Sequence, residues 1–192
     1  MSTGTKARAV RFDRYGGPEV LYVAEVELPP PPPGEVLVEV RAAGINPGES
    51  GIRTGALAGR FPAVFPEGQG SDLAGVVRAV GEGGTDRSVG EEVLGWSWRR
   101  SSHATSVLVP AGQLVPKPPE LSWEVAGSLY VVGCTAFAAV RAVDPQPGEV
   151  VAVSAAAGGV GALVVQLLRR RGVTVLGPVS YTHLTLPTIL RV

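Results

Sequence analysis

The 192-residue sequence predicts two successive fold classes, a β unit followed by an α/β unit. Up to about residue 121, short apolar runs are separated by glycine and proline, a pattern typical of strands joined by tight turns. From Ser122 the apolar residues follow helical spacing, and residues 150–176 then read as strand, glycine turn, helix and strand. These patterns predict domains at residues 1–121 and 122–177, with residues 178–192 as a separate tail.

The first predicted pair of strands is a hairpin. Ala9–Phe12 and Leu21–Leu28 have strand composition, and Gly16, Gly17 and Pro18 between them supply turn geometry. Pro29–Pro33 cannot donate main-chain hydrogen bonds, so this run ends the second strand as a stiff spacer. A ligand for proline-binding domains is the alternative interpretation of the run.

The next predicted strands complete a small, partly closed β unit. In the first of them Val36, Val38 and Val40 share one face, which we expect to be buried, while Leu37, Glu39 and Arg41 face solvent. The strands are expected at residues 36–41, 72–80, 92–94 and 105–109.

The α/β unit begins with helical spacing from Val125 to Val140, for which Ser122 is a candidate N-cap. We expect an interruption of this helix near Gly133. After a turn at residues 144–149, Val150–Val153 is a continuous apolar strand of the sort that parallel sheets bury on both faces.

A glycine-rich turn, Ala155–Gly161, follows that strand and precedes a predicted helix from Ala162. Small residues let the main chain approach a pyrophosphate, and the helix start attracts the anion. Arg169–Arg171 and Gly172 are better explained as helix-closing residues than as ligands. The alternative is a tight turn without a ligand. No carboxylate follows the second strand at Leu176, which favours NADP over NAD.

Composition excludes several function classes. With 17 basic and 17 acidic residues, the chain lacks the positive charge that sequence-independent binding to nucleic acid requires. Its apolar runs are far shorter than the roughly 20 residues of a membrane span, and its first residues do not resemble a signal peptide. Cys134 is the single cysteine, so an internal disulfide or a multi-cysteine zinc site is excluded. We therefore expect a cytoplasmic protein that contacts neither nucleic acid nor membrane.

Five motifs together resemble the zinc-independent quinone oxidoreductase branch of the medium-chain dehydrogenase/reductase family. The resemblance covers about residues 7–177. It implies a GroES-like β-barrel domain, then an incomplete, doubly wound Rossmann domain, with NADPH as cofactor and a homodimeric parent. The motifs are Tyr15–Leu21, Ala42–Pro47, Gly70–Val77, Gly133–Ala136 and Ala155–Gly161.

The resemblance also implies the absence of a metal site. Zinc-dependent relatives place cysteine where this chain has Asn46, histidine at Ser71 and cysteine at Val131. None of these three side chains is expected to bind metal here. Cys134 does not occupy the sequence position of a zinc-binding cysteine, and we expect it to be a small structural residue.

Site residues carried over from the family are one catalytic residue and a set that binds cofactor. Asn46 is the expected catalytic residue, although asparagine before proline is also typical of turns. Thr135 is expected to contact the cofactor, the alternative being a helix-internal hydroxyl bonded to a main-chain carbonyl. The remaining cofactor-binding residues are Ala157, Gly158, Gly159, Val160 and Gly161.

Three positions qualify the resemblance. Gly51 stands where many relatives have tyrosine, which removes a phenolic contact to substrate. His103 is expected to be a solvated loop residue rather than a proton donor. Asp72 matches a carboxylate position of the family, where a structural role is equally consistent with its place at the edge of a strand.

The function implied for the parent protein is hydride transfer from NADPH to a quinone or an α,β-unsaturated carbonyl compound. A non-catalytic nucleotide-binding or regulatory protein of the same fold is the alternative. The sequence does not name the physiological substrate. Residues 180–188 resemble translated adaptor sequence rather than the family, so we expect this chain to be a truncated form with little activity.

Overall fold

The computed structural model describes residues 4–177, which form two compact units divided between Val131 and Val132. The first unit is built of β-sheets and the second contains helices and parallel strands, so the predicted fold class is confirmed. The predicted domain boundary between residues 121 and 122 stays a prediction. The predicted tail at residues 178–192 lies outside the described residues.

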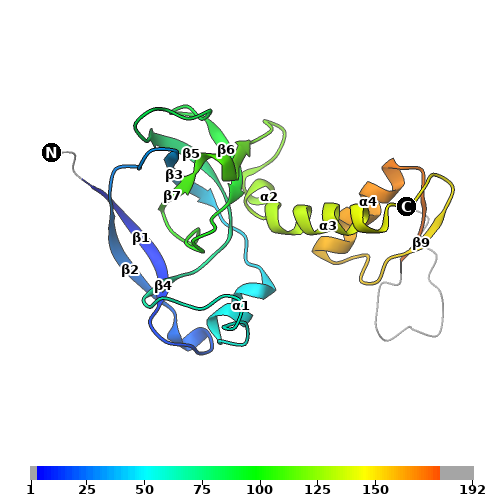
Figure 1. Cartoon of the computed structure of the whole chain (residues 1–192), viewed down its shortest axis with the longest axis horizontal. Coiled ribbons are helices and arrows are strands. Elements are labelled where there is room, and N and C mark those ends of the chain that lie inside the picture. The colour runs from blue at the N-terminus through cyan, green and yellow to red at the C-terminus, as the bar shows by residue number, and fades with distance from the viewer. Residues whose placement is uncertain (1–3, 178–192) are drawn as a thin grey trace. The chain divides into compact units, whose positions relative to one another are not determined.

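The predicted hairpin is confirmed. Strand β1 (Thr5–Phe12) pairs antiparallel with β2 (Tyr22–Leu28) over its length, and a 3-10 turn, η1 (Pro18–Val20), joins them (Figure 1). A short strand, β4 (Glu67–Gly68), adds to the other edge of β1. Strand β1 begins four residues before the predicted start at Ala9.

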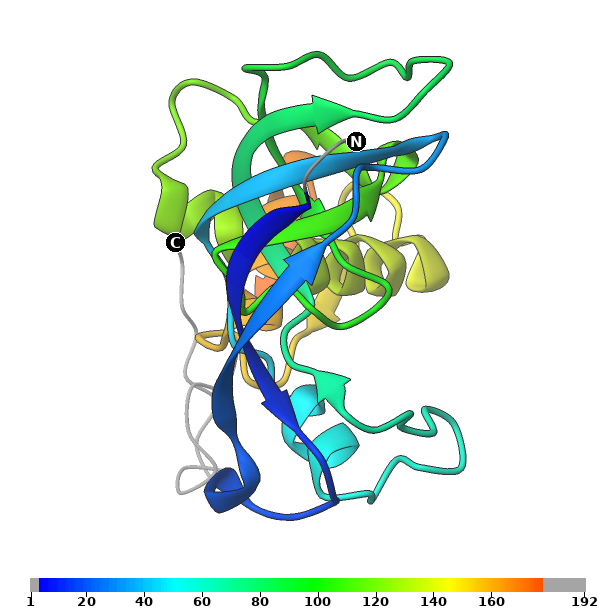
Figure 2. The same ribbon diagram turned by 90° about the vertical axis from the view of Figure 1, so that its left-hand side faces the viewer.

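A five-stranded antiparallel sheet with the order β7-β3-β5-β6-β8 forms the rest of the first unit. Figure 2 shows its strongly curved strands beside the β1–β2 hairpin. The 3-10 turn η2 (Ala111–Gln113) leads into β8. The strands are β3 (Glu35–Ala42), β5 (Asp72–Val80), β6 (Glu92–Trp96), β7 (Ser106–Pro110) and β8 (Leu114–Pro116).

The inner face of this sheet forms the main hydrophobic core. Val36 and Val38 are fully buried there, as their alternation predicts. Leu37, expected to face solvent, is also buried, which corrects the prediction for that residue. It lies in register between Leu108 of β7 and Ala79 of β5, whose side chains are on the same face of the sheet and flank Leu37 there.

Two short helices of the first unit have clear local causes. Helix α1 (Pro47–Arg53) begins with proline, whose fixed backbone angle suits the first helical position. Helix α2 (Trp123–Gly127) starts at Ser122, whose Oγ accepts a hydrogen bond from the Val125 N–H at 3.3 Å. The predicted N-cap is therefore confirmed, whereas α1, β4 and β8 were not predicted.

The break in the predicted long helix lies earlier than expected. Helix α3 (Tyr130–Val143) runs through Gly133, so the expected interruption there is wrong. The break falls at residues 128–129, next to Gly127, whose carbonyl accepts the Gly44 N–H from outside the helix at 2.7 Å.

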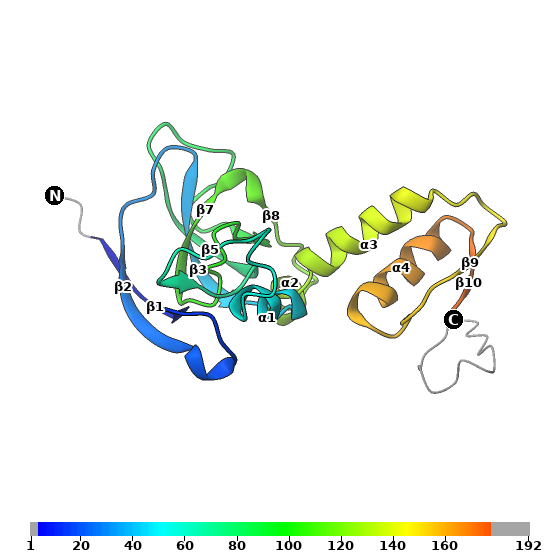
Figure 3. The same ribbon diagram turned by 60° about the horizontal axis from the view of Figure 1, so that its bottom comes forward.

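The second unit contains a parallel two-stranded sheet and two helices (Figure 3). Strand β9 (Val150–Ala152) pairs in parallel with β10 (Thr174–Leu176), and α4 (Gly159–Arg170) connects them. Helix α4 begins three residues before the predicted start and ends at Arg170. Gly172, just after the C-cap Arg171, has a φ of +74° that suits the predicted closing role.

A small hydrophobic core joins these elements. Leu168 of α4 and Val140 of α3 pack with Val153 and Val173 next to the strands. Val150 is 62% exposed, so the expectation of a strand buried on both faces does not hold among the described residues, where the sheet has only two strands. No helix within residues 4–177 combines the length and apolar character that crossing a bilayer requires.

Candidate cofactor-binding and active site

Asn46 lies between β3 and α1, at the N-cap position of the helix. Its main-chain carbonyl accepts the Glu49 N–H at 3.0 Å, which begins the helix. The side chain makes no capping hydrogen bond. Its Nδ2 instead donates to Oδ2 of Asp72 at 3.2 Å. The turn interpretation therefore accounts for the main chain of Asn46 but not for its side chain.

Asp72 is the first residue of β5 and is 1% exposed. Its Oδ1 accepts the N–H of Val131 in the first turn of α3 at 2.9 Å, where a negative charge also suits the helix dipole. Burial raises the pKa of this carboxyl, and the nearby charge of Glu49 raises it further. The hydrogen bonds from Asn46 and Val131 oppose the rise because they stabilise the ionised form.

Glu49 and His103 form a second buried pair beside Asn46. Oε1 of Glu49 accepts the Ser71 N–H at 3.0 Å, and the side chain is 5% exposed. Nε2 of His103 lies 2.9 Å from the Gly44 carbonyl oxygen and 3.9 Å from Oε2 of Glu49. Because a carbonyl only accepts, this nitrogen carries a proton.

The expectation that His103 is solvated is wrong, since its side chain is 15% exposed. Gly70, with a φ of +96°, lies directly against the imidazole, and a Cβ there would come within 2.6 Å of the ring. The main chain of His103 is also held, because its N–H donates to Gln69 and its carbonyl accepts from Val10. The surrounding structure therefore fixes the ring.

Close main-chain packing holds the residues just before Asn46 in place. The Gly44 N–H donates to the Gly127 carbonyl at 2.7 Å. A Cβ at Gly44 would lie 2.9 Å from Cα of Ser128 and 3.3 Å from Oδ2 of Asp72. Only glycine fits this close approach, which helps to place Asn46 beside Asp72.

Gly51, the position at which the resemblance implies tyrosine in many relatives, faces a side chain that fills part of the adjacent space. A Cβ at Gly51 would lie 3.0 Å from Cδ1 of Leu57. A tyrosine could enter here only if Leu57 moved. The missing phenolic contact is thus accompanied by a local difference in packing.

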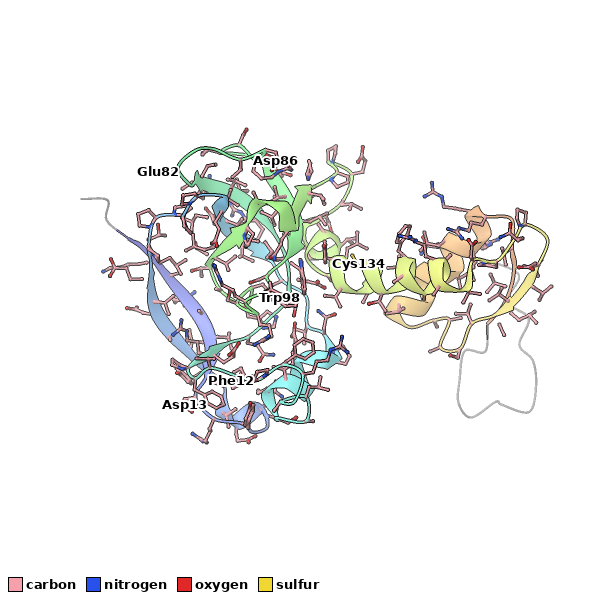
Figure 4. The ribbon with its side chains drawn as sticks, viewed as in Figure 1. Phe12, Asp13, Glu82, Asp86, Trp98 and Cys134 are labelled. Atoms are coloured by element: carbon pink, nitrogen blue, oxygen red, sulfur yellow. The ribbon has the colours of Figure 1, made fainter. Side chains whose placement is uncertain are left out.

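The three positions of the zinc ligands carry Asn46, Ser71 and Val131. Within residues 4–177, no group of three histidine, cysteine, aspartate or glutamate side chains gathers in a way that could hold a metal ion. Cys134 is exposed, and Figure 4 shows its place on α3. Thr135 follows it on the same helix and is also exposed.

The glycine turn of the second unit has the geometry of a strand-to-helix connection. Ala155 adopts a φ of +52°, which is rare for residues other than glycine. Its carbonyl accepts the Gly158 N–H at 2.9 Å, and the first helical bond runs from the Ala162 N–H to the Gly158 carbonyl at 2.8 Å. The N–H groups of residues 159–161 therefore open the helix, where no earlier helical turn supplies acceptors.

The glycines of the turn differ in what surrounds them. A Cβ at Gly161 would collide with the Ala155 carbonyl, and it would lie 2.9 Å from Cα of Ala156. A Cβ at Gly159 would find room, because its nearest neighbour, Cγ1 of Val132, would lie at an ordinary contact distance of 3.5 Å. Ala157, Gly158 and Gly159 are exposed, whereas Val160 is partly buried. The turn thus presents an uncovered main chain that fits a pyrophosphate.

The end of β10 lies beside the start of this turn. The Val153 N–H donates to the Leu176 carbonyl at 2.8 Å, so the carboxyl ends of both strands meet at one edge. Gly177 is buried next to Ala156, where a Cβ would lie 2.7 Å from that side chain. The position after Leu176 therefore offers neither a carboxylate nor room for one.

The predicted site residues fall in both units. Asn46 belongs to the first unit, and Thr135 and the glycine turn belong to the second. Sequence reasoning missed the contact between Asn46 and Asp72, and it missed Glu49 entirely. Glu49 follows the motif Ala42–Pro47 by two residues and Asp72 lies within the motif Gly70–Val77, and this was the one signal that could have suggested a buried cluster.

Comparison with known proteins gives two kinds of match. Residues 32–119 match the alcohol dehydrogenase GroES-like domain. The chain is 38% identical to the quinone oxidoreductase of Mus musculus over 183 residues, which are 92% of this chain and 54% of that protein. The chain thus spans about half the length of the curated relatives it matches, and the predicted resemblance is confirmed.

Solved structures show the same likeness. The quinone oxidoreductase of Coxiella burnetii is 30% identical, with a TM-score of 0.86 over 93% of this chain and 58% of that one. The Escherichia coli quinone oxidoreductase complexed with NADPH is 30% identical, with a TM-score of 0.80 over 88% of this chain and 52% of that one.

Proposed function

We propose that this chain is part of an NADPH-dependent oxidoreductase. The first support is the match of residues 32–119 to the alcohol dehydrogenase GroES-like domain. The proposed reaction is reduction of a quinone or an α,β-unsaturated carbonyl compound without zinc. The likeness to quinone oxidoreductases supports this class of activity.

The observation that carries the proposal is the glycine turn. Its open main chain at residues 157–159 and the close approach at Gly161 suit a nucleotide pyrophosphate at the start of α4. The proposed cofactor ligands are Ala157, Gly158, Gly159, Val160 and Gly161, with Thr135 from α3. A Cβ at Gly161 would push the turn away from the helix, so this glycine keeps the cradle in shape.

The proposed cofactor is NADPH rather than NADH. In NAD-specific sites an acidic side chain after the second strand binds the ribose 2′-hydroxyl. Gly177 stands there and is buried against Ala156. The E. coli relative was solved with NADPH, which agrees with the proposal.

Asn46 is the proposed catalytic residue. The bound nicotinamide would supply the hydride, so the protein's task is to orient the acceptor and to hold a polar contact at the reacting group. An amide can do this, since it offers both a donor and an acceptor. The hydrogen bond to buried Asp72 holds the amide in place for such a contact.

The zinc-free chemistry is supported by the side chains at the ligand positions. An asparagine amide and a serine hydroxyl are poor zinc ligands, and the side chain of Val131 has no atom that can bind zinc. A homodimeric parent and a cytoplasmic location stay predictions of the sequence.

A direct test uses a chimera in which residues 1–177 are followed by the C-terminal half of a quinone oxidoreductase relative. We expect it to oxidise NADPH in the presence of a quinone or an enone, with a chelator having no effect. Asn46→Ala should lower turnover, whereas Ser50→Ala, on an exposed position of α1, serves as the matched control and should not. Loss of activity on chelation would contradict the zinc-free reaction.

The alternative, a nucleotide-binding or regulatory protein without catalysis, rests on two departures from the family pattern, Gly51 and His103. It predicts that the chimera binds NADPH in a calorimetric titration and turns over no quinone or enone. Little activity of the 192-residue chain itself, the sequence-based expectation, is checked in the same assay.

A further inference from the structure

Asn46 lacks the contact that its position in the helix normally provides. An asparagine at the N-cap usually accepts a hydrogen bond on its side chain from the second or third helical N–H. Here the side chain accepts no such hydrogen bond from α1, and its Nδ2 donates instead to Asp72. A stabilising local contact is thus replaced by a contact to a residue 26 positions away.

The carboxylate of Asp72 is itself anchored at both oxygens. Oδ1 accepts from the Val131 N–H and Oδ2 accepts from Asn46. Because an ionised carboxylate only accepts, the NH₂ group of Asn46 must face it. The amide oxygen of Asn46 is then turned away from Asp72, together with the second N–H.

The side chains of two other titratable residues lie near this pair, and within residues 4–177 neither of them forms a hydrogen bond with the Asn46 side chain. Glu49 uses Oε1 for the Ser71 N–H and acts on Asp72 through its charge. His103 points its Nε2 at the Gly44 carbonyl and lies 3.9 Å from Glu49. The orientation of the Asn46 amide therefore depends on Asp72.

We propose that Asp72 is a positioning residue that fixes the side-chain amide of Asn46 with its oxygen turned away from the carboxylate. The inference rests on the proposed function, in which Asn46 contacts the reacting groups. It adds that the amide oxygen meets a hydrogen-bond donor of cofactor or substrate, such as a primary carboxamide. If Asp72 takes up a proton it becomes a donor, and the Asn46 amide then turns over.

A purely structural role for Asp72, as the cap of α3, makes different predictions. In Asp72→Asn one oxygen remains for the Val131 N–H, so the cap is preserved. The new NH₂ group then faces Asn46, whose amide must turn to accept from it. If the role of Asp72 is purely structural, the orientation of the Asn46 side-chain amide does not depend on the charge of residue 72.

The first test is an NMR titration of the ¹⁵N-labelled 192-residue chain. The NH₂ resonances of Asn46 are assigned by their loss in Asn46→Ala. We expect these resonances to shift with pH as Asp72 ionises, and to lose that shift in Asp72→Asn. Glu49→Gln is the matched control, a buried carboxylate that contacts the Ser71 N–H instead. It should keep the shift with its midpoint at lower pH, because a like charge has been removed.

The second test is reciprocal and needs no change at Asp72. The Asn46 hydrogen bond favours the ionised carboxylate, so Asn46→Ala should raise the pKa of Asp72, as read from its ¹³C carboxyl resonance. Two results would overturn the proposal. One is that the NH₂ chemical shifts of Asn46 do not change as Asp72 ionises, and the other is that Asn46→Ala leaves the titration midpoint of Asp72 unchanged.

Kinetics of the chimera separate this inference from the proposed function. We expect Asp72→Asn to lower kcat/KM about tenfold, within the usual effect of removing a residue that orients a site ligand. Because Asp72 acts through Asn46, the double variant should be no slower than Asn46→Ala alone. An unsubstituted chimera without turnover would contradict the proposed function, while the NMR titrations would still decide the role of Asp72.

Discussion

Gly161→Ala tests whether close packing of the glycine turn supports the second unit. The added methyl group meets only main-chain atoms, namely the carbonyl of Ala155 and Cα of Ala156 at 2.9 Å. A main chain cannot move aside as the end of a flexible side chain can. The turn and the start of α4 must therefore separate.

The magnitude follows from two opposing contributions. Overpacking of a close contact costs about 1–3 kcal/mol. Replacing a helical glycine by alanine returns up to about 1 kcal/mol through helix propensity. We expect Gly161→Ala to lower the free energy of unfolding of the second unit by roughly 1–2 kcal/mol.

Gly159→Ala is the matched control in the same turn. A methyl group there finds its nearest neighbour at 3.5 Å, which is ordinary contact, so only the propensity gain applies. We expect this variant to be unchanged or up to about 1 kcal/mol more stable. The two substitutions, two residues apart, should act in opposite directions.

Urea denaturation followed by two probes gives the assay. Helices α3 and α4 have 14 and 12 residues against 7 and 5 for α1 and α2, so circular dichroism at helical wavelengths reports mainly the second unit. All three tryptophans, Trp96, Trp98 and Trp123, belong to the first unit. Equal dichroism midpoints for Gly161→Ala and the unsubstituted chain, or an equal loss in Gly159→Ala, would refute the reasoning.

Three further perturbations probe other parts of the chain. Because the pKa of Asp72 is raised above its ordinary value, the folded chain holds this proton more tightly than the unfolded chain, and the free energy of unfolding should fall as pH rises through the raised pKa. Urea denaturation over a pH series should show a weaker fall in Asp72→Asn, and an identical slope would contradict the argument. Leu168→Ala removes a side chain that is 1% exposed in the core of the second unit, and we expect it to cost about 2–5 kcal/mol, measured by the dichroism transition. Ser122→Ala deletes the Oγ that accepts the Val125 N–H, with an expected cost of about 1 kcal/mol in the tryptophan fluorescence transition, and a neutral result would show that the cap is unimportant.

Local signals in the sequence predicted most of the regular structure. Strand β5 has the predicted bounds, Asp72–Val80, because nine residues of strand composition lie between turn residues. Ser122 and Gly172 mark the ends of helices through side-chain and backbone preferences that operate within a few residues. Strand β4 was missed because two residues carry no periodicity, and their pairing with β1 depends on a distant segment.

The candidate site shows where such reasoning ends. The turn at Ala155–Gly161 is recognisable because the proposed pyrophosphate contact needs consecutive small residues, which the sequence displays directly. Asn46, Asp72 and His103 come together from a helix start, a strand start and a loop, and no local pattern records their contacts. The helix break at residues 128–129 was misplaced for the same reason, since the adjacent Gly127 carbonyl accepts a hydrogen bond from a distant segment.

Within residues 4–177, each of the three hydrophobic clusters draws its residues from a single unit. Substitutions within one of these clusters therefore need to match only side chains of the same unit in that cluster. A crossover at Val131 would also keep the hydrogen bond to Asp72, because a main-chain N–H donates it and any residue except proline supplies that group. Libraries that recombine the first unit with different second units at this position would keep the Asp72–Asn46 contact intact.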